Sequence, residues 1–314
     1  MIRVGKERWE AKIPYEAGGQ EMDAAKKKHN RIEEIDSLFD SVKAFRTTER
    51  TGDLLHFVAR LPGIAPYNAM LVYFQKPGSE FVATARQWSE FGRYPKVNAN
   101  PLVILKQFGP VAFVYDVGDT EGEPLPEGVL DPFGIKGNFD ERKHRRLLDN
   151  LPREGIALSY GDYGPNMAGN IQKLGTYRIF TIPTRTKTFQ VRNCFEIVVN
   201  KNLSMVAEVA TIFHELGHYF CGHFPMDGSI KHIPQRETKK LSDGLKEFEA
   251  ETVCWLICER LDIDNPSEQY LSDYLGRNHD IPEGISIDAI LKACGRIESM
   301  VYGTYRTPKE LLVE

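Results

Sequence analysis

The sequence contains no long apolar run. Nowhere do about 18 apolar residues follow one another, which is the length that a membrane-spanning helix needs. The first twenty residues, MIRVGKERWEAKIPYEAGGQ, also contain no apolar segment of the kind that a secretory signal peptide requires. We therefore expect a protein that is not exported and that has no membrane partner.

Cysteine is scarce, and neither sign of charge dominates. The chain has five cysteines, an odd number, and all of them lie in its second half, unlike a disulfide framework. This usage favours a reducing compartment, so we expect a cytoplasmic protein. The formal net charge of -4 provides no general attraction to nucleic acid, and any such binding would need a local patch.

Length and composition are typical of a globular protein. At 314 residues with 41% hydrophobic side chains, the chain is long enough for two domains of ordinary size. We predict an α+β fold with a helical lead (1–50), a small mixed α/β domain with a linker (51–150) and a mostly helical domain with a short sheet (151–314). A Gly/Pro-rich and then charged stretch from Thr120 to Leu151 places the boundary near residue 150.

Periodicity and turn residues indicate the individual elements. Apolar residues at spacings of three and four predict helices within 23–60, 61–78, 204–223, 243–261, 267–275 and 286–302. Runs of β-branched and aromatic residues predict strands at 102–105 and 111–117, and weaker ones at 177–183 and 194–200. We expect a polar loop between residues 86 and 101.

The segment TIFHELGHYFCGH carries the strongest chemical signal. Its thirteen residues, 211–223, hold three of the eight histidines in the chain. His214 and His218 are four residues apart, so on a helix they project from one side and can reach the same small cation. Glu215 lies about 100° further round and can approach a metal-bound water without being a ligand. This HExxH arrangement is that of the zinc hydrolases, so we expect Zn²⁺ as the cofactor.

A catalytic zinc needs a third protein ligand, and two regions offer one. His223 follows His214 by nine residues, whereas the metzincin pattern has a histidine ten residues on and a glycine where Cys221 stands, so we interpret His223 as a neighbour of the site. The later helix offers Glu247, Glu249 and Glu251, of which Glu249 points about 200° away from Glu247. We predict that Glu247 is the ligand and that Glu251 orients a histidine, although the choice among the three glutamates stays open.

Two stretches resemble a known group of metal-site helices. FHELGHYFCGH (213–223) and KEFEAETVCWLICERLDI (246–263) are similar to those of the ImmA/IrrE metallopeptidases and the ArdC-type antirestriction proteins. In the first half, YNAMLVYFQKPGSEFVATARQWSEFGR and VYDVGDTEGEPLP resemble the single-stranded-DNA-binding domain of the ArdC type. The resemblance implies such a domain ahead of a zincin-like metallopeptidase domain. ArdC-type proteins commonly have one residue fewer before the last histidine.

The N-terminal match departs from the family at a turn that is usually rich in glycine and lysine. This chain has RYPKVNANPLVIL there, which leaves few cations to contact phosphate and predicts weaker DNA binding. Five residues nearby form the candidate surface for stacking on a single strand or for a partner: Arg86, Trp88, Arg93, Tyr94 and Lys96. A core position for Trp88 and Phe91 is an equal alternative.

Two hypotheses for the function follow. In the first, the protein is a zinc metallopeptidase in which Glu215 is the general base. The family resemblance implies a protein substrate, with a helix-turn-helix repressor as one candidate partner. In the second, the protein binds single-stranded DNA as an antirestriction or regulatory factor, and its zinc is mainly structural. Glu215 favours the first, because a purely structural site needs no base beside the metal.

Overall fold

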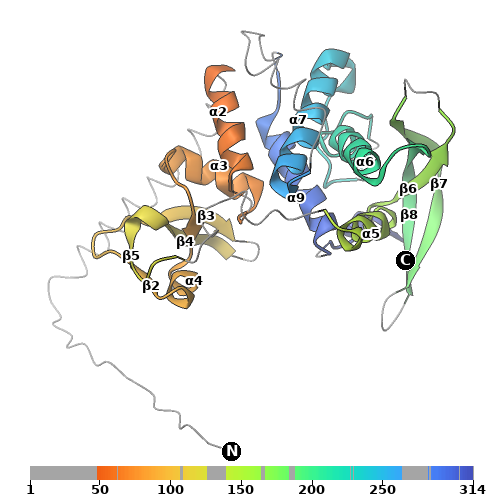
Figure 1. Ribbon diagram of the computed structural model, residues 1–314. Coiled ribbons are helices and arrows are strands. Elements are labelled where there is room, and N and C mark those ends of the chain that lie inside the picture. Colours follow the sequence, from red (N-terminus) through yellow and green to blue (C-terminus); the bar gives the residue numbers. More distant parts are fainter. Residues whose placement is uncertain are drawn as a thin grey trace, which may run out of the picture. The chain divides into compact units, whose positions relative to one another are not determined.

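The computed structural model describes residues 48–313 apart from positions 62, 107–108, 126–138, 164–166, 184–187, 227, 229, 264–281, 283 and 304 (Figure 1). Residues 46–314 form one compact unit, and the expected boundary near residue 150 stays a prediction. The helix expected at 267–275 lies outside the described residues, as does the helical lead apart from residues 48–50. No described helix is both long and apolar enough to cross a lipid bilayer.

Among the described residues, the first part of the unit combines three helices with two small antiparallel sheets. Helix α2 (Thr48–Ala59) precedes α3 (Pro66–Gln75), which begins at a proline, a residue that suits the first helical position. The larger sheet has the order β1 (Val82–Ala83), β4 (Gly109–Asp116), β3 (Leu102–Lys106). Strand β2 (Arg93–Pro95) pairs with β5 (Thr120–Gly122), which follows the short turn η1 (Val117–Asp119). The mixture of helix and strand agrees with the α+β prediction.

The polar loop expected between residues 86 and 101 is wrong in part. Residues Ala85–Glu90 form helix α4, and strand β2 also lies within the range. Thr84 caps it, since its hydroxyl accepts from the Gln87 amide while the Gln87 side chain accepts from the Thr84 amide. The Trp88 side chain on this helix is fully buried, and its ring N–H donates to the Tyr115 carbonyl at 2.9 Å.

A longer sheet than expected supports the second part. Its main strands are β6 (Ile156–Gly161), β8 (Thr188–Asn200) and β7 (Gly169–Pro183), in that spatial order, and β9 (Leu312–Val313) also pairs with β8. Strand β6 is parallel to β8, whereas β7 and β9 are antiparallel to it. Every second residue of β8 from 191 to 199 is buried, as expected for a strand with one face on a core.

Four helices of the described residues complete this part: α5 (Glu141–Asn150), α6 (Met205–Phe220), α7 (Asp243–Leu261) and α9 (Ile287–Val301). Ser204, Ser242 and Ser286 cap the last three, each accepting a hydrogen bond from the amide three residues on. These caps explain why the predicted bounds agree closely with the observed ones. Figure 1 shows α6 between the sheet and α7. Short turns η2 (Pro152–Glu154), η3 (Thr238–Lys240) and η4 (Lys309–Leu311) join the longer elements.

Arg260 on α7 connects the turn after α2 to helices α7 and α9 through hydrogen bonds and an ion pair. Its buried guanidinium donates to the carbonyl oxygens of Val58, Leu61 and Ile64 at 2.7, 3.0 and 2.8 Å. Its Nε lies 2.6 Å from Oε1 of Glu298 on α9. A planar guanidinium with five donors thus bonds three carbonyls at once, and those of Val58 and Leu61 also accept from backbone amides of the turn.

His232 lies between two carboxylates. Its Nδ1 is 2.8 Å from Oε1 of Glu310 on η4, and its Nε2 contacts Oε1 of Glu154, which also accepts from the Tyr219 hydroxyl. Burial lowers the pKa of His232, but the two carboxylates outweigh that effect and raise the pKa above its usual value. The charged imidazole therefore ties η4 to η2 and to helix α6.

Replacing Arg260 with methionine should lower the free energy of unfolding by about 3–5 kcal/mol, because the change leaves the Glu298 carboxylate without its charged partner and removes a donor from three carbonyls. Urea unfolding followed by circular dichroism measures the loss. Arg86→Met is the matched control, since the Arg86 side chain is 90% exposed and should change stability by no more than about 0.5 kcal/mol. Equal losses in the two variants would contradict the anchoring role.

The contribution of His232 to the free energy of unfolding should decrease as the pH rises. Its pKa is raised in the folded state, so its stabilising effect is complete below the unfolded pKa of about 6.5 and is lost as pH rises through the folded pKa. The difference in unfolding free energy between wild type and His232→Gln should thus be largest near pH 6 and shrink towards pH 9. His56→Gln, on the exposed face of α2, is the control. If the difference in unfolding free energy between wild type and His232→Gln grew as the pH rose, the prediction would be wrong.

Candidate metal centre

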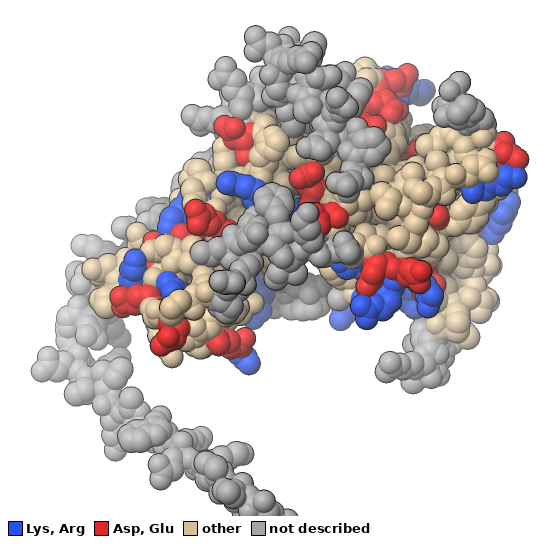
Figure 2. Space-filling model, in the orientation of Figure 1, with Lys and Arg blue, Asp and Glu red and all other residues tan. Residues whose placement is uncertain are grey.

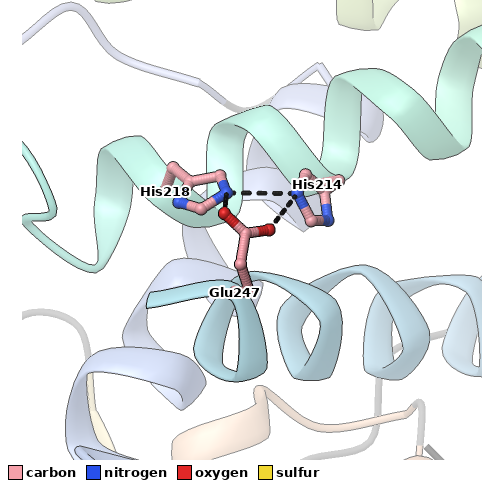
Figure 3. A group of neighbouring side chains, drawn as sticks. All are labelled: His214, His218 and Glu247. Atoms are coloured by element: carbon pink, nitrogen blue, oxygen red, sulfur yellow. Dashed lines mark hydrogen bonds and ion pairs between the residues drawn. The ribbon is translucent and has the colours of Figure 1, made fainter. Parts of the chain in front are cut away.

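Helix α6 presents His214 and His218 to helix α7. The two Nε2 atoms lie 3.1 Å apart, one helical turn from each other (Figure 3). Glu247 on α7 reaches both rings, with its carboxylate oxygens 3.4 Å from Nε2 of His214 and 3.5 Å from Nε2 of His218. The structure thus brings together the three residues that the sequence predicts as ligands.

The separations fit a small divalent cation. Two imidazole nitrogens and a carboxylate oxygen are a donor set typical of transition metals. Ligand atoms on one tetrahedral ion with bonds of 2.0–2.1 Å lie roughly 3.3 Å apart, and the separations here run from 3.1 to 3.5 Å. His214, His218 and Glu247 can therefore hold such an ion with little rearrangement.

A close contact between α6 and α7 makes this convergence possible. A Cβ atom at Gly217 would lie only 3.0 Å from both the Cα and the carbonyl oxygen of Ala250. Only glycine allows the two backbones to approach this closely without displacement. Because Gly217 lies next to His218, and Ala250 lies between Glu247 and Glu251, the contact sets the distance across the site.

Glu251 supports His214 from the other side. Its Oε1 lies 3.4 Å from Nδ1 of His214, which leaves Nε2 of that ring directed towards Glu247. Burial lowers the pKa of His214, but Glu247 and Glu251 outweigh it and raise the pKa to about 10. The two histidines in turn hold the pKa of Glu247 well below its usual range. The position of Glu251, against the ring nitrogen of His214 that faces away from Glu247, is the one expected of an orienting carboxylate.

Behind His218 runs a chain of three more side chains. Nδ1 of His223 lies 2.9 Å from Nδ1 of His218, and Nε2 of His223 lies 2.8 Å from Oε2 of Glu249. Arg236 pairs with both oxygens of Glu249, which also accepts from the Ser286 amide at 2.7 Å. Glu249 is fully buried and belongs to this chain, away from the rings' Nε2 atoms. No local pattern in the sequence marks Arg236, which sequence reasoning missed.

A second group of donors fits a metal less well. Ligand atoms of Cys221, His223 and Glu249 also lie within 4.8 Å of one another, and all three residues are buried. Glu249 already binds Arg236 and a backbone amide, however, and burial raises the pKa of the Cys221 thiol, which disfavours the thiolate that metals require.

Glu215 shares a cavity with the three ligand candidates. The cavity has a volume of about 420 Å³, and its wall includes His214, His218, Glu247 and residues 169–171 of strand β7. Burial raises the pKa of Glu215, whereas His214 and His218 lower it and so does a hydrogen bond from the Ile171 amide. The cavity therefore places the Glu215 carboxylate beside the convergent donors.

Of the five residues predicted as a nucleic-acid or partner surface, Trp88 is buried and the other four are exposed or half-buried. Trp88 belongs to the core, which is the second of the two alternatives that the sequence left open for this residue. Arg93 donates to the Thr120 hydroxyl and carbonyl and to the Glu123 carbonyl, and Lys96 donates to the Gly118 carbonyl. Arg86 and Tyr94 are exposed. In Figure 2, positive and negative side chains are interspersed over the visible face.

No family model matches the chain. The chain is 22% identical over 292 residues to an uncharacterised protein of Bacillus anthracis, pXO2-81. The match covers 78% of this chain and 46% of that protein. The chain thus spans about half the length of this curated relative.

Among solved structures, the chain is similar to the antirestriction protein ArdC from the R388 plasmid. The metal-free structure has a TM-score of 0.35 and 16% identity, and covers 86% of this chain and 97% of ArdC. The Mn(II)-bound structure has a TM-score of 0.36 and 15% identity, and covers 85% and 95%. Scores and identities this low carry no argument about the site.

Replacing Gly217 with alanine should weaken binding of Zn²⁺, used as the test ion, by roughly tenfold, as changes to groups that position ligands do. The added methyl group forces α7 away by a few tenths of an ångström and so moves Glu247 from the histidines. Competition with a chromophoric chelator measures the affinity. Gly244→Ala on α7 is the control, because its Cβ would meet no atom within 4 Å. Wild-type affinity in Gly217→Ala would contradict the role of the contact.

Proposed function

We propose that the chain is a zinc-dependent peptidase. His214, His218 and Glu247 hold the zinc, and Glu215 is the general base. The observation that carries the proposal is that Glu215 lines the same cavity as the three converging donors. A structural zinc site is closed by four protein ligands, whereas a hydrolytic one has three and opens to a cavity where water and substrate enter.

The residues around the zinc have separate tasks. Zinc bound there supplies Lewis acidity for a carbonyl and lowers the pKa of water towards neutrality. Glu215 accepts the proton of the attacking water and passes it to the nitrogen of the leaving amine. The Ile171 amide holds the Glu215 carboxylate in place. Glu251 and His223 fix the orientation of the rings of His214 and His218.

The strand beside the cavity supports a peptide as the substrate. Among the described strands, β7 pairs only with β8, so its other edge is not covered by a described strand, although the Ile171 amide donates to Glu215. Gly169, Asn170 and Ile171 at the start of β7 line the cavity. An extended peptide that adds to this edge places its backbone across the site through main-chain hydrogen bonds. The substrate is then a protein segment in extended form, and a helix-turn-helix repressor is the candidate that the resemblance implies.

The alternative, a single-stranded-DNA-binding protein with a structural zinc, has less support from the described residues. Trp88 is buried, and Arg93 and Lys96 already donate to backbone carbonyls. Their cations are therefore less available to phosphate than the sequence alone suggests.

Glu215→Gln should retain about one zinc per chain and lose about 100- to 10,000-fold in the rate of peptide hydrolysis, the range typical of a missing general base. His214→Ala should lose the zinc itself. Elemental analysis of protein purified without added metal gives the zinc content, and a mixture of quenched fluorogenic peptides gives the rate. Glu90→Gln, on the exposed face of α4, is the control. A wild-type protein without zinc would refute the proposal.

A further inference from the structure

A second and larger cavity lies apart from the metal centre. It has a volume of about 830 Å³ and is formed by one face of α9, the loop 231–235 and residues 305–306. The end of α6 contributes Phe220 to its wall. A cavity of this size suits an organic molecule rather than a single ion, because known ligand pockets measure about 300–1,000 Å³. The proposed peptidase reaction uses none of its residues.

Positive charge dominates the wall of this cavity, although the whole chain is acidic. Lys231, Lys292, Arg296 and Arg306 line it against a single carboxylate, Asp288. Asp288 pairs with Lys292 at 2.8 Å. The ring of His232 also lines the cavity, and its charge is offset by the carboxylates of Glu154 and Glu310. The four Lys and Arg side chains of the wall therefore outnumber its one carboxylate, and their positive potentials add within the cavity.

Two polar groups on this wall have no hydrogen-bond partner within the described residues. Tyr305 is 8% exposed, and its buried hydroxyl neither donates nor accepts a hydrogen bond. The half-buried guanidinium of Arg296 also donates none to the described part of the chain, although its charge lies near enough to Glu154 to lower the pKa of that carboxyl. Buried polar groups in folded proteins are rarely left unpaired. An anion with several oxygen acceptors would supply partners that the protein itself does not.

The rest of the wall is apolar. Phe220, Ile233, Pro234 and Ala293 contribute side chains that cannot hydrogen-bond, and Ile233 is almost fully buried. A ligand that matches both parts has a multiply charged anionic group at one end and an apolar or aromatic group at the other.

We propose that this cavity binds a small phosphorylated organic molecule of about nucleotide size. The phosphate contacts Arg296 and Lys292 on α9, and the organic part lies against Phe220 and Ile233. Arginine suits the phosphate end because its planar donors can pair with two oxygens at once. The loop that lines the cavity continues directly into Arg236, which holds Glu249 behind the metal centre. An occupied cavity would therefore restrain the same loop that supports His218.

Isothermal titration of the full chain with AMP, ribose 5-phosphate, inorganic phosphate and adenosine tests the proposal. AMP or ribose 5-phosphate should bind, inorganic phosphate at least tenfold more weakly, and adenosine not measurably. Lys292→Met and Arg296→Met should each weaken that binding by at least tenfold. Lys239→Met, an exposed lysine on η3, should leave it unchanged. Circular dichroism confirms that each variant is folded, and Lys292, which is exposed, provides the variant least prone to unfold.

Three results would overturn the proposal. One is the failure of both phosphorylated compounds to bind the wild-type protein. Another is equal affinity for inorganic phosphate and AMP, which would indicate a simple ion site. A third is a single-stranded oligonucleotide that binds more tightly than AMP and is lost in the same two variants, which would assign the cations to nucleic acid. None of these measurements involves zinc or peptide hydrolysis, so their outcome is separate from that of the proposed peptidase function.

Discussion

The contact between Gly217 and Ala250 is the constraint on which the candidate metal centre depends. At this contact the backbones of α6 and α7 are so close that a Cβ atom at Gly217 would not fit without displacing one of them. Glu247 and Glu251 then lie on opposite sides of His214, one towards each ring nitrogen. Two helices that packed at the usual 8–10 Å on larger side chains would leave these groups too far apart to share an ion.

Around this contact, buried charges are paired in a way that fixes the later helices. Arg236 holds Glu249, Arg260 holds Glu298, and His232 lies between two carboxylates. Such pairs are weak contributors to net stability but costly to break, so they select one arrangement of the elements over others. The loop 230–236 takes part in two of these groups. It links the chain of residues behind His218 to the wall of the larger, cationic cavity.

Local signals in the sequence were enough to predict much of the fold. The helices that carry the site begin at serine caps, and their bounds depend on residues within one turn, so α6, α7 and α9 agree with the predicted ranges to within a few residues. Strand β7 was predicted only in part, because many of its side chains are exposed and the alternation that marks a strand is weak. Trp88 could not be placed from sequence, since a tryptophan in a polar stretch suits a stacking surface and a core equally well.

By itself, the sequence determined that His214 and His218 share a helix face with Glu215 beside them, because a spacing of four residues is a property of one helix. It also favoured one glutamate-rich helix as the source of the predicted third ligand. Only the tertiary structure decided among Glu247, Glu249 and Glu251 for the position opposite the histidines. The tertiary structure also placed Arg236 against Glu249 and gathered four Lys and Arg side chains around a second cavity. These outcomes depend on how segments far apart in the chain pack together, and packing across such distances leaves no periodic trace in any single segment.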